Sequence, residues 1–208
     1  MKVGMVMFYD DIIKNYGELN YKINKKYCEK YDIELIVSNK KQTVKHSAWE
    51  RLPLLLEHIS KFDYVIWIDA DAFFYHDANN IVDVIEDNRD VEFIFSNDFG
   101  NQNINTGIFI VKNSQYSIDF LTRWLYDEDL YANNPQPYWW DQGVLIDMCK
   151  KNILDIQQNS THVDYGVLQH FREKDKSKET FIFHLAGRDP ITRYNVSKQY
   201  YDNLMTST

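Results

Sequence analysis

The sequence predicts an α/β fold with a mainly parallel central sheet flanked by helices. Short apolar runs of strand length alternate along the chain with longer segments of helical periodicity. One apolar run, residues 64–68, leads directly into Asp69, Ala70 and Asp71. This order places two carboxylates at the carboxyl edge of a buried strand, the edge at which open α/β sheets bind their ligands.

The first quarter of the chain predicts a strand, a helix and a second strand, followed by another helix. Residues 3–9 and 33–37 are apolar runs, and residues 11–31 between them mix polar and apolar positions. Ser47 and Glu50 then have the spacing of a capping box, so a helix is expected to begin at Ser47. Pro53 predicts an irregular first turn there, because proline removes a backbone donor.

The same alternation continues to the end of the chain. Residues 80–87 are expected to be helical, and residues 91–96 and 107–111 to be strands. Asn113 and Ser114 are expected to cap a helix that runs to residue 124. The remaining expected elements are a polar loop over 127–138, a helix over 142–149, a strand over 181–183 and a closing helix over 196–205. Because no linker or repeat interrupts them, residues 1–208 are expected to form one domain.

Composition excludes several classes of protein. Hydrophobic residues at 44% and charged residues at 26% are typical of globular proteins. The net charge of −8 repels phosphate backbones and anionic lipid, so nucleic acid is not an expected partner. The two cysteines make no disulfide framework, and no signal peptide or apolar membrane anchor is visible, which predicts a cytoplasmic protein. The aromatic content of 15% suits sugar or base ligands.

The pair Asp69 and Asp71 is a candidate metal site. Two residues apart on an extended chain, both carboxylates project to the same side and can bind one cation. Mg²⁺ or Mn²⁺ takes one or two protein carboxylates and fills its other positions with water and substrate phosphate oxygens. The alternative is a solvated turn, because this short pattern occurs often by chance.

A second candidate group follows the late apolar run. His184 offers an imidazole, which binds Mn²⁺ well, and Gly187 allows the backbone to approach a ligand closely. Arg188 can form a bidentate pair with a diphosphate. The alternative is a structural histidine packed after a strand.

A third group suits carbohydrate. Asn105 and Thr106 precede a predicted strand, and two adjacent tryptophans, ending at Trp140, precede Asp141 and Gln142. Amide and carboxylate groups match the paired donors and acceptors of sugar hydroxyls, and indole faces match the C–H faces of pyranose rings. The alternatives are turn chemistry and, for Asp141, a helix N-cap.

Five motifs occur in a fixed order between positions 49 and 187. They read WERLP at 49–53, WIDADAFF at 67–74, NTGIFIVKN at 105–113, DQ at 141–142 and HLAG at 184–187. In this order the chain resembles glycosyltransferase family thirty-four, which contains α-galactosyl and α-mannosyl transferases of yeasts and xyloglucan xylosyltransferases of plants. Two departures stand out: no membrane anchor or stem is visible, and Arg188-Asp189 replaces the family's Cys-Lys.

The resemblance implies a GT-A type, nucleotide-sugar-binding fold and a retaining transfer reaction. The donor would be a nucleotide diphosphate sugar such as a UDP-hexose or UDP-pentose, and the acceptor a carbohydrate or glycoprotein joined by an α-glycosidic bond. The metal would be Mn²⁺ or Mg²⁺. Two other classes remain open: a non-catalytic module that binds carbohydrate or a nucleotide sugar, and a nucleotidyltransferase, although no Gly-rich phosphate loop follows the first predicted strand.

The resemblance also implies a role for each matching residue. Asp69, Asp71 and His184 would hold the metal, and Asp141 and Gln142 would lie beside the anomeric carbon. The expected substrate-binding residues are Tyr9, Arg51, Ala70, Asn105, Thr106, Trp140, Gly187 and Arg188. Because the family's lysine is replaced, the cation expected at the diphosphate is either Arg188 or Arg193.

Overall fold

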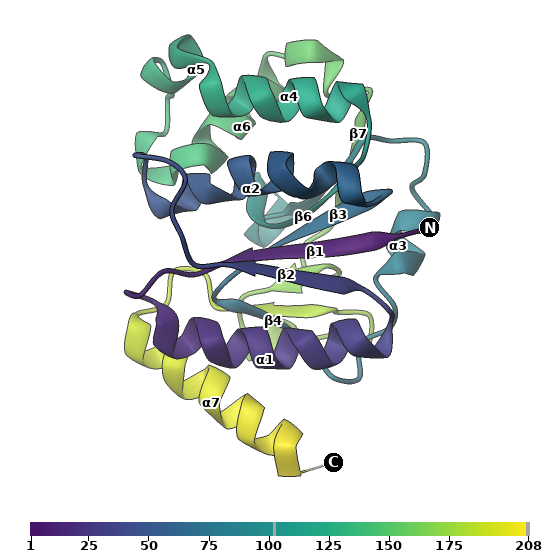
Figure 1. Ribbon diagram of the computed structural model, residues 1–208, viewed down its shortest axis with the longest axis vertical. Coiled ribbons are helices and arrows are strands. Elements are labelled where there is room, and N and C mark those ends of the chain that lie inside the picture. Colours follow the sequence, from purple (N-terminus) through teal and green to yellow (C-terminus); the bar gives the residue numbers. More distant parts are fainter. Residues whose placement is uncertain (102, 207–208) are drawn as a thin grey trace.

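A computed structural model describes residues 1–101 and 103–206 and places six strands in one sheet, in the order β2-β1-β3-β6-β5-β7 (Figure 1). Their bounds are β1 Val3–Phe8, β2 Glu34–Ser38, β3 Tyr64–Asp69, β5 Phe93–Asn97, β6 Ile104–Lys112 and β7 Ser160–Val163. β6 is antiparallel to β3 and β5, whereas β1 pairs in parallel with β2 and β3, and β5 with β7. The predicted mainly parallel sheet is therefore confirmed.

A second, smaller sheet includes the strand that follows β3 in the sequence. It contains β4 (Ala72–Phe74), β9 (Ile182–His184) and β8 (Gln169–His170), in the order β4-β9-β8. β4 and β9 are antiparallel, and their register pairs Ala72 with His184. The strand expected at 181–183 is thus present, while the short strands β4, β7 and β8 were not anticipated. This pairing brings the carboxyl end of β9 to the end of β3.

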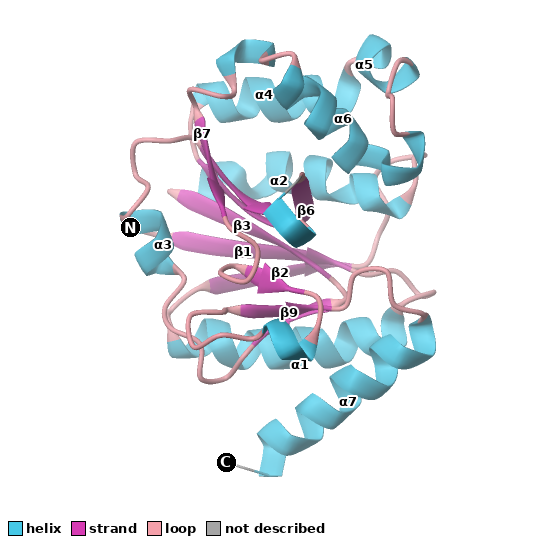
Figure 2. Cartoon of the chain, turned by 180° about the vertical axis from the view of Figure 1, so that it is seen from behind, coloured by secondary structure: helices cyan, strands magenta, loops and turns pink. Residues whose placement is uncertain are grey.

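Helices cover both faces of the main sheet (Figures 1 and 2). One side carries α1 (Lys14–Lys30) and α7 (Pro190–Thr206), and the other carries α2 (Arg51–His58), α4 (Gln115–Tyr126) and α6 (Trp140–Lys150). The short helices are α3 (Val82–Glu86) and α5 (Glu128–Ala132). Alternate strand residues feed two separate apolar cores, Met5 and Ile66 on the α1 side and Val6 and Val65 on the α2 side, as expected for strands buried on both faces.

The helix expected to begin at Ser47 begins later and without the predicted capping box. Residues Ser47–Glu50 form a single 3₁₀ turn, and α2 starts at Arg51. The Ser47 hydroxyl donates to Asp10, and the buried Glu50 carboxylate accepts from the backbone N–H groups of Gln42 and Thr43. Both side chains found tertiary partners that a local motif does not reveal. The irregular first turn that Pro53 predicted is this 3₁₀ turn.

The closing helix is longer than predicted. It was expected over 196–205, but α7 begins at Pro190, a residue suited to the first position of a helix. The Asp189 carboxylate accepts from the N–H groups of Ile191 and Thr192, which satisfies two donors of the first turn. Within the described residues, no helix has both the length and the apolar character needed to cross a bilayer.

Candidate functional site

A cavity of about 530 Å³ opens at the carboxyl ends of β1 and β3. Its lining draws on segments that are far apart in the sequence. Among the residues singled out above, those in the lining are Arg51, Asp69, Ala70, Asp71, Asn105, Thr106, Trp140, Asp141, Gln142, His184 and Gly187. The fold therefore gathers these eleven residues around one space, together with Arg193.

The other two candidates, Tyr9 and Arg188, are not in the lining. Tyr9 lies against α1, where a Cβ added to Gly17 would be 2.7 Å from its ring, and the neighbouring Asp10 faces the cavity instead. Adjacent side chains of an extended chain point in opposite directions, so Tyr9 and Asp10 do not face the same side. Arg188 is exposed and donates to the Phe171 carbonyl at 3.4 Å. Both side chains thus lie outside the lining of this cavity, and their expected role in binding substrate stays a prediction.

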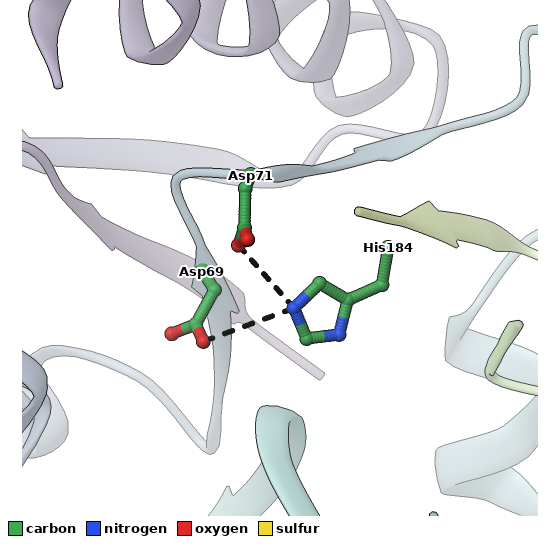
Figure 3. Close-up of side chains that lie close together, drawn as sticks. All are labelled: Asp69, Asp71 and His184. Atoms are coloured by element: carbon green, nitrogen blue, oxygen red, sulfur yellow. Dashed lines mark ion pairs between the residues drawn. The ribbon is translucent and has the colours of Figure 1, made fainter. Parts of the chain in front are cut away.

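Two carboxylates and an imidazole meet on one side of this cavity (Figure 3). Asp69 is the last residue of β3, Asp71 lies two residues further along the chain, and His184 is the last residue of β9. His184 Nε2 lies 3.3 Å from Asp71 Oδ1 and 4.0 Å from Asp69 Oδ2, and one donor atom from each side chain falls within 4.8 Å of the others. This donor set fits a divalent cation, and its imidazole favours Mn²⁺ over Mg²⁺.

The charged groups of the cluster shift one another's pKa values. Burial opposes the charge of Asp71, but His184 and Arg193 outweigh it and lower its pKa to about 2. Burial raises the pKa of Asp69, an effect that Arg51 partly offsets. Burial alone would lower the pKa of His184, yet the two aspartates outweigh it and raise that pKa. Without a metal, the two carboxylates are therefore compensated by His184 and by the two nearby arginines.

Arg193, from the first turns of α7, is one of two arginines that reach this cluster. Its Nη2 lies 2.9 Å from Asp71 Oδ2, and its Nη1 donates to the Tyr16 hydroxyl at 3.2 Å. Arg193 also lines the cavity, unlike Arg188. Of the two arginines left open by the sequence, Arg193 is therefore the one that lies at the cavity.

Arg51 is buried between the metal-type cluster and Asp141. Only 4% of it is exposed, and its Nη2 lies 3.2 Å from Asp69 Oδ1 while its Nε lies 3.3 Å from Asp141 Oδ2. The guanidinium also donates to the backbone carbonyls of Ala48 and Thr106. Because each of its three nitrogens already contacts the protein, Arg51 is built to hold two carboxylates in place.

Asp141 and Gln142 lie in the first turn of α6. Asp141 is 1% exposed, and burial raises its pKa to about 6 although Arg51 acts in the opposite direction. Gln142 Oε1 accepts from the Thr106 backbone N–H at 3.2 Å, so the amide group of Gln142 is fixed against β6. The helix begins at Trp140 and no side chain caps it, so the alternative reading of Asp141 as an N-cap is wrong.

Three consecutive aromatic residues form a rim on the cavity, which we call the aromatic rim: Tyr138, Trp139 and Trp140. Their exposed fractions are 87%, 38% and 44%, high for rings of this size. The Trp140 indole stacks on the His46 ring with centroids 4.0 Å apart and an interplanar angle of 2°. The rim therefore offers flat surfaces to a ligand, and one of them is held in place.

Sequence reasoning missed three buried amides that support the site. Asn20 and Asn24, one turn apart on α1, donate to the carbonyls of Ala70 and Ala72 at 2.8 and 3.1 Å and so hold the segment between β3 and β4. Gln169 in β8 lies between Asn105 and His184. A signal existed for the first two, because paired asparagines on the apolar face of a predicted helix require buried partners. For Gln169 the signal is weaker, a single amide in a short strand.

Comparison with known proteins places the chain in a family. The sequence profile of a family described as "Protein of unknown function, DUF273" matches residues 24–163. The chain belongs to the DUF273 family. Among curated protein sequences, none matches it.

Solved structures share the fold of this DUF273 chain. A glycosyltransferase involved in the glycosylation of the major capsid of PBCV-1 has a TM-score of 0.77 at 12% identity, over 96% of this chain and 100% of that one. The galactosyltransferase LgtC, solved with donor and acceptor sugar analogs, has a TM-score of 0.55 at 12% identity, over 96% and 95%. The glycosyltransferase GlyE of Streptococcus pneumoniae has a TM-score of 0.60 at 13% identity, over 100% of this chain and 64% of its own. The expected GT-A type fold is confirmed.

Gly107 leaves room for His184, and we expect its replacement to disturb the metal-type cluster of the DUF273 chain. A Cβ at Gly107 would lie 2.1 Å from His184 Cε1, too close to be accommodated without moving the imidazole. We expect Gly107→Ala to weaken Mn²⁺ binding by about 10- to 100-fold, the cost typical of disturbing groups that orient a metal ligand. Isothermal titration with Mn²⁺ measures this loss.

Gly17→Ala is the matched control for this substitution. It also crowds a ring, that of Tyr9, but away from the cavity lining. It is therefore expected to lower thermal stability while leaving Mn²⁺ affinity unchanged. Equal Mn²⁺ affinity in Gly107→Ala and the unmodified protein would mean that His184 is not a ligand.

Proposed function

We propose that this DUF273 chain, over residues 1–208 as one catalytic domain, is a metal-dependent retaining glycosyltransferase. It would move a hexose or pentose from a nucleotide diphosphate sugar, in particular a UDP-sugar, to a carbohydrate or glycoconjugate acceptor and form an α-glycosidic bond. The observation that carries the proposal is the cluster of Asp69, Asp71 and His184 in the cavity at the carboxyl edge of β3. The ordered motifs shared with family thirty-four and the fold shared with glycosyltransferases support it.

Asp69, Asp71 and His184 would hold Mn²⁺ or Mg²⁺. When bound, such an ion neutralises the charge that builds up on a departing diphosphate. Arg193 would add a second positive charge from the α7 side, within reach of the same phosphate oxygens. Asn20 and Asn24 would keep the two aspartates in register by holding the backbone around them.

The environment of Asp141 supports retention of configuration. An inverting enzyme needs a free general base on the face opposite the leaving group, but Asp141 is buried and paired with Arg51. Gln142 is a neutral amide and a poor nucleophile. We therefore favour a same-face route, in which the bond from the anomeric carbon to the diphosphate oxygen breaks and the acceptor oxygen bonds to that carbon on the same face. The departing diphosphate oxygen takes the acceptor proton, and Asp141 and Gln142 stabilise the cationic sugar.

The aromatic rim would bind the acceptor. We expect Trp140→Ala to raise the acceptor KM by roughly 3- to 10-fold, the value of about 0.5–1.5 kcal/mol of ring stacking, with little change in the donor KM. Initial rates at varied acceptor and donor concentrations measure both constants. Tyr126→Ala removes another exposed ring, outside the cavity lining, and should change neither. If Trp140→Ala lowers only the melting temperature, the aromatic rim stabilises the fold and does not bind the acceptor.

A panel of UDP- and GDP-sugars with Mn²⁺ and labelled sugar tests the function itself. Release of nucleotide diphosphate together with label on an acceptor is the expected result. Binding of the donor without turnover would instead identify a non-catalytic module, and release of sugar 1-phosphate would identify a nucleotidyltransferase, because nucleotidyl transfer from such a donor leaves the sugar on the β-phosphate. The label is then found on the acceptor, on the intact donor or on sugar 1-phosphate, so a single chromatographic separation distinguishes the three outcomes.

A further inference from the structure

A chain of four polar groups runs from the backbone of β6 to the imidazole of His184. Its first member is the Gly107 N–H, which can only donate, and it lies 2.9 Å from Asn105 Oδ1. The atom of Asn105 that faces it must therefore be the carbonyl oxygen rather than the amide nitrogen. This backbone contact fixes the orientation of the Asn105 amide, which distance alone would leave ambiguous.

The next contact fixes the orientation of Gln169. Asn105 Oδ1 also faces the side-chain amide of Gln169 at 3.1 Å, and because an oxygen accepts, the facing atom of Gln169 must be Nε2. The other end of the same amide, Oε1, then lies 2.6 Å from His184 Nδ1. Since Oε1 can only accept, Nδ1 must carry a proton.

We infer that Gln169 is a positioning residue that holds His184 in the Nδ1–H form and leaves Nε2 as the atom that binds metal. Nε2 is the nitrogen that faces the two aspartates, at 3.3 Å from Asp71 and 4.0 Å from Asp69. A histidine coordinates through an unprotonated nitrogen, and a partner on its other nitrogen selects which one is available. The inference rests on the proposed metal dependence and deepens it by naming the group that prepares the ligand.

The surroundings prevent the ring from turning to another partner. Gln169 is 0% exposed and His184 is 3% exposed, so bulk water does not compete for Nδ1. One edge of the ring lies against Gly107, and the Phe171 ring packs edge-on at 5.4 Å. Rotation of the imidazole would lose the Gln169 contact and press the ring on these neighbours.

Asn105 takes on a different role in this arrangement from the one the resemblance implies. Its Oδ1 accepts from two donors, Gly107 N–H and Gln169 Nε2. A carbonyl oxygen has two lone pairs, so this oxygen has none left for a hydroxyl of the donor sugar. Through that oxygen, Asn105 acts on the reaction by orienting Gln169, and through it His184.

The tautomer of His184 can be read directly in the metal-free protein. Two-bond ¹H–¹⁵N correlation spectra, recorded at a pH where the ring is neutral, distinguish a protonated nitrogen from an unprotonated one. We expect a pyrrole-like Nδ1 and a pyridine-like Nε2, with the signals assigned by their loss in His184→Gln. The opposite pattern, Nε2–H with unprotonated Nδ1, would overturn the inference without any use of metal or sugar.

Substitution of Gln169 gives a second, independent readout. We expect Gln169→Leu, which removes the acceptor for Nδ1–H, to weaken Mn²⁺ binding about 10- to 100-fold in isothermal titration. Gln169→Glu loses the donor to Asn105 but retains an oxygen that accepts from Nδ1–H, so it should keep this tautomer and lose less affinity than Gln169→Leu. Asn113→Leu is the control, because it removes an amide bonded to the Phe62 carbonyl at the far end of β6 and should cost stability alone.

Wild-type Mn²⁺ affinity in a folded Gln169→Leu protein would refute the role of Gln169. If that variant does not fold, Gln169→Glu and the spectra of the unmodified protein decide the question. Failure of the proposed function looks different. In that case His184 would show the Nδ1–H form and Mn²⁺ binding would depend on Gln169, but no donor would give transfer. This result would support the role of Gln169 and refute the glycosyltransferase proposal.

Discussion

Asp69→Asn and Asp71→Asn are each expected to lower kcat by at least about 10³-fold while the protein stays folded. Each substitution removes a charged ligand from a cluster of three, and metal stabilisation of a departing diphosphate contributes several kcal/mol, with each 1.4 kcal/mol worth a factor of ten. β3, which ends at Asp69, remains hydrogen-bonded to β1 and β6, and the segment that contains Asp71 remains held by Asn20 and Asn24. Steady-state rates with saturating donor and Mn²⁺, together with thermal melts, measure both effects.

Asp147→Asn is the matched control for these two substitutions. Asp147 is as buried as Asp71 and is also paired with a cation, Lys151 at 2.7 Å, but it lies outside the cavity lining. It should leave kcat and Mn²⁺ affinity unchanged. Full activity of Asp69→Asn or Asp71→Asn in chelator-treated buffer would refute the metal assignment.

Asp141→Asn is expected to lower kcat by about 10²- to 10³-fold, the usual effect of removing one electrostatic group aimed at developing charge. Gln142→Ala should slow transfer less, because an amide dipole stabilises a cationic sugar more weakly than a carboxylate does. The free energy of unfolding of Asp141→Asn should not fall, although its kcat does. Raising the Asp141 pKa from 3.8 to about 6 means that ionising it in the folded protein costs about 3 kcal/mol near neutral pH, and asparagine avoids that cost.

The pH dependence of Asp141 has a definite sign. Its charge is lost as the pH falls through about 6, so the kcat of the unmodified protein should fall below that pH and Asp141→Asn should not show this step. Stability moves in the opposite direction. Because the folded pKa lies above the unfolded one, the unmodified protein gains stability from this group as the pH falls from about 6 toward 4, and the variant does not. Rate profiles and chemical denaturation across this range test both statements.

The configuration of the product tests the same-face route. An α-linked donor should give an α-linked product, and the anomeric coupling in a proton NMR spectrum of the fresh product reports it. A β linkage would contradict the proposed role of Asp141 and Gln142 and also the resemblance to family thirty-four.

The sequence by itself determined the parts of the protein that depend on local pattern. The apolar run before Asp69 predicted a buried strand, and β3 ends at that residue because the carboxylate marks the point where the chain leaves the core. The alternation of strands and helices predicted the mainly parallel sheet, since the periods of the two elements differ and are visible along the chain. Candidate residues at strand ends were found for the same reason, because strands of an α/β sheet deliver their carboxyl ends to one edge.

Only the tertiary structure decided how the polar side chains are partnered. The β4–β9 register set His184 beside Asp71, a backbone pairing between segments far apart in the sequence. Side-chain partners likewise turned Ser47 toward Asp10 and placed Arg193, rather than Arg188, at the cluster. An apolar residue needs only to be inside, which a pattern reveals, whereas a buried polar group needs a particular partner at about 3 Å, and that choice is made when distant segments pack.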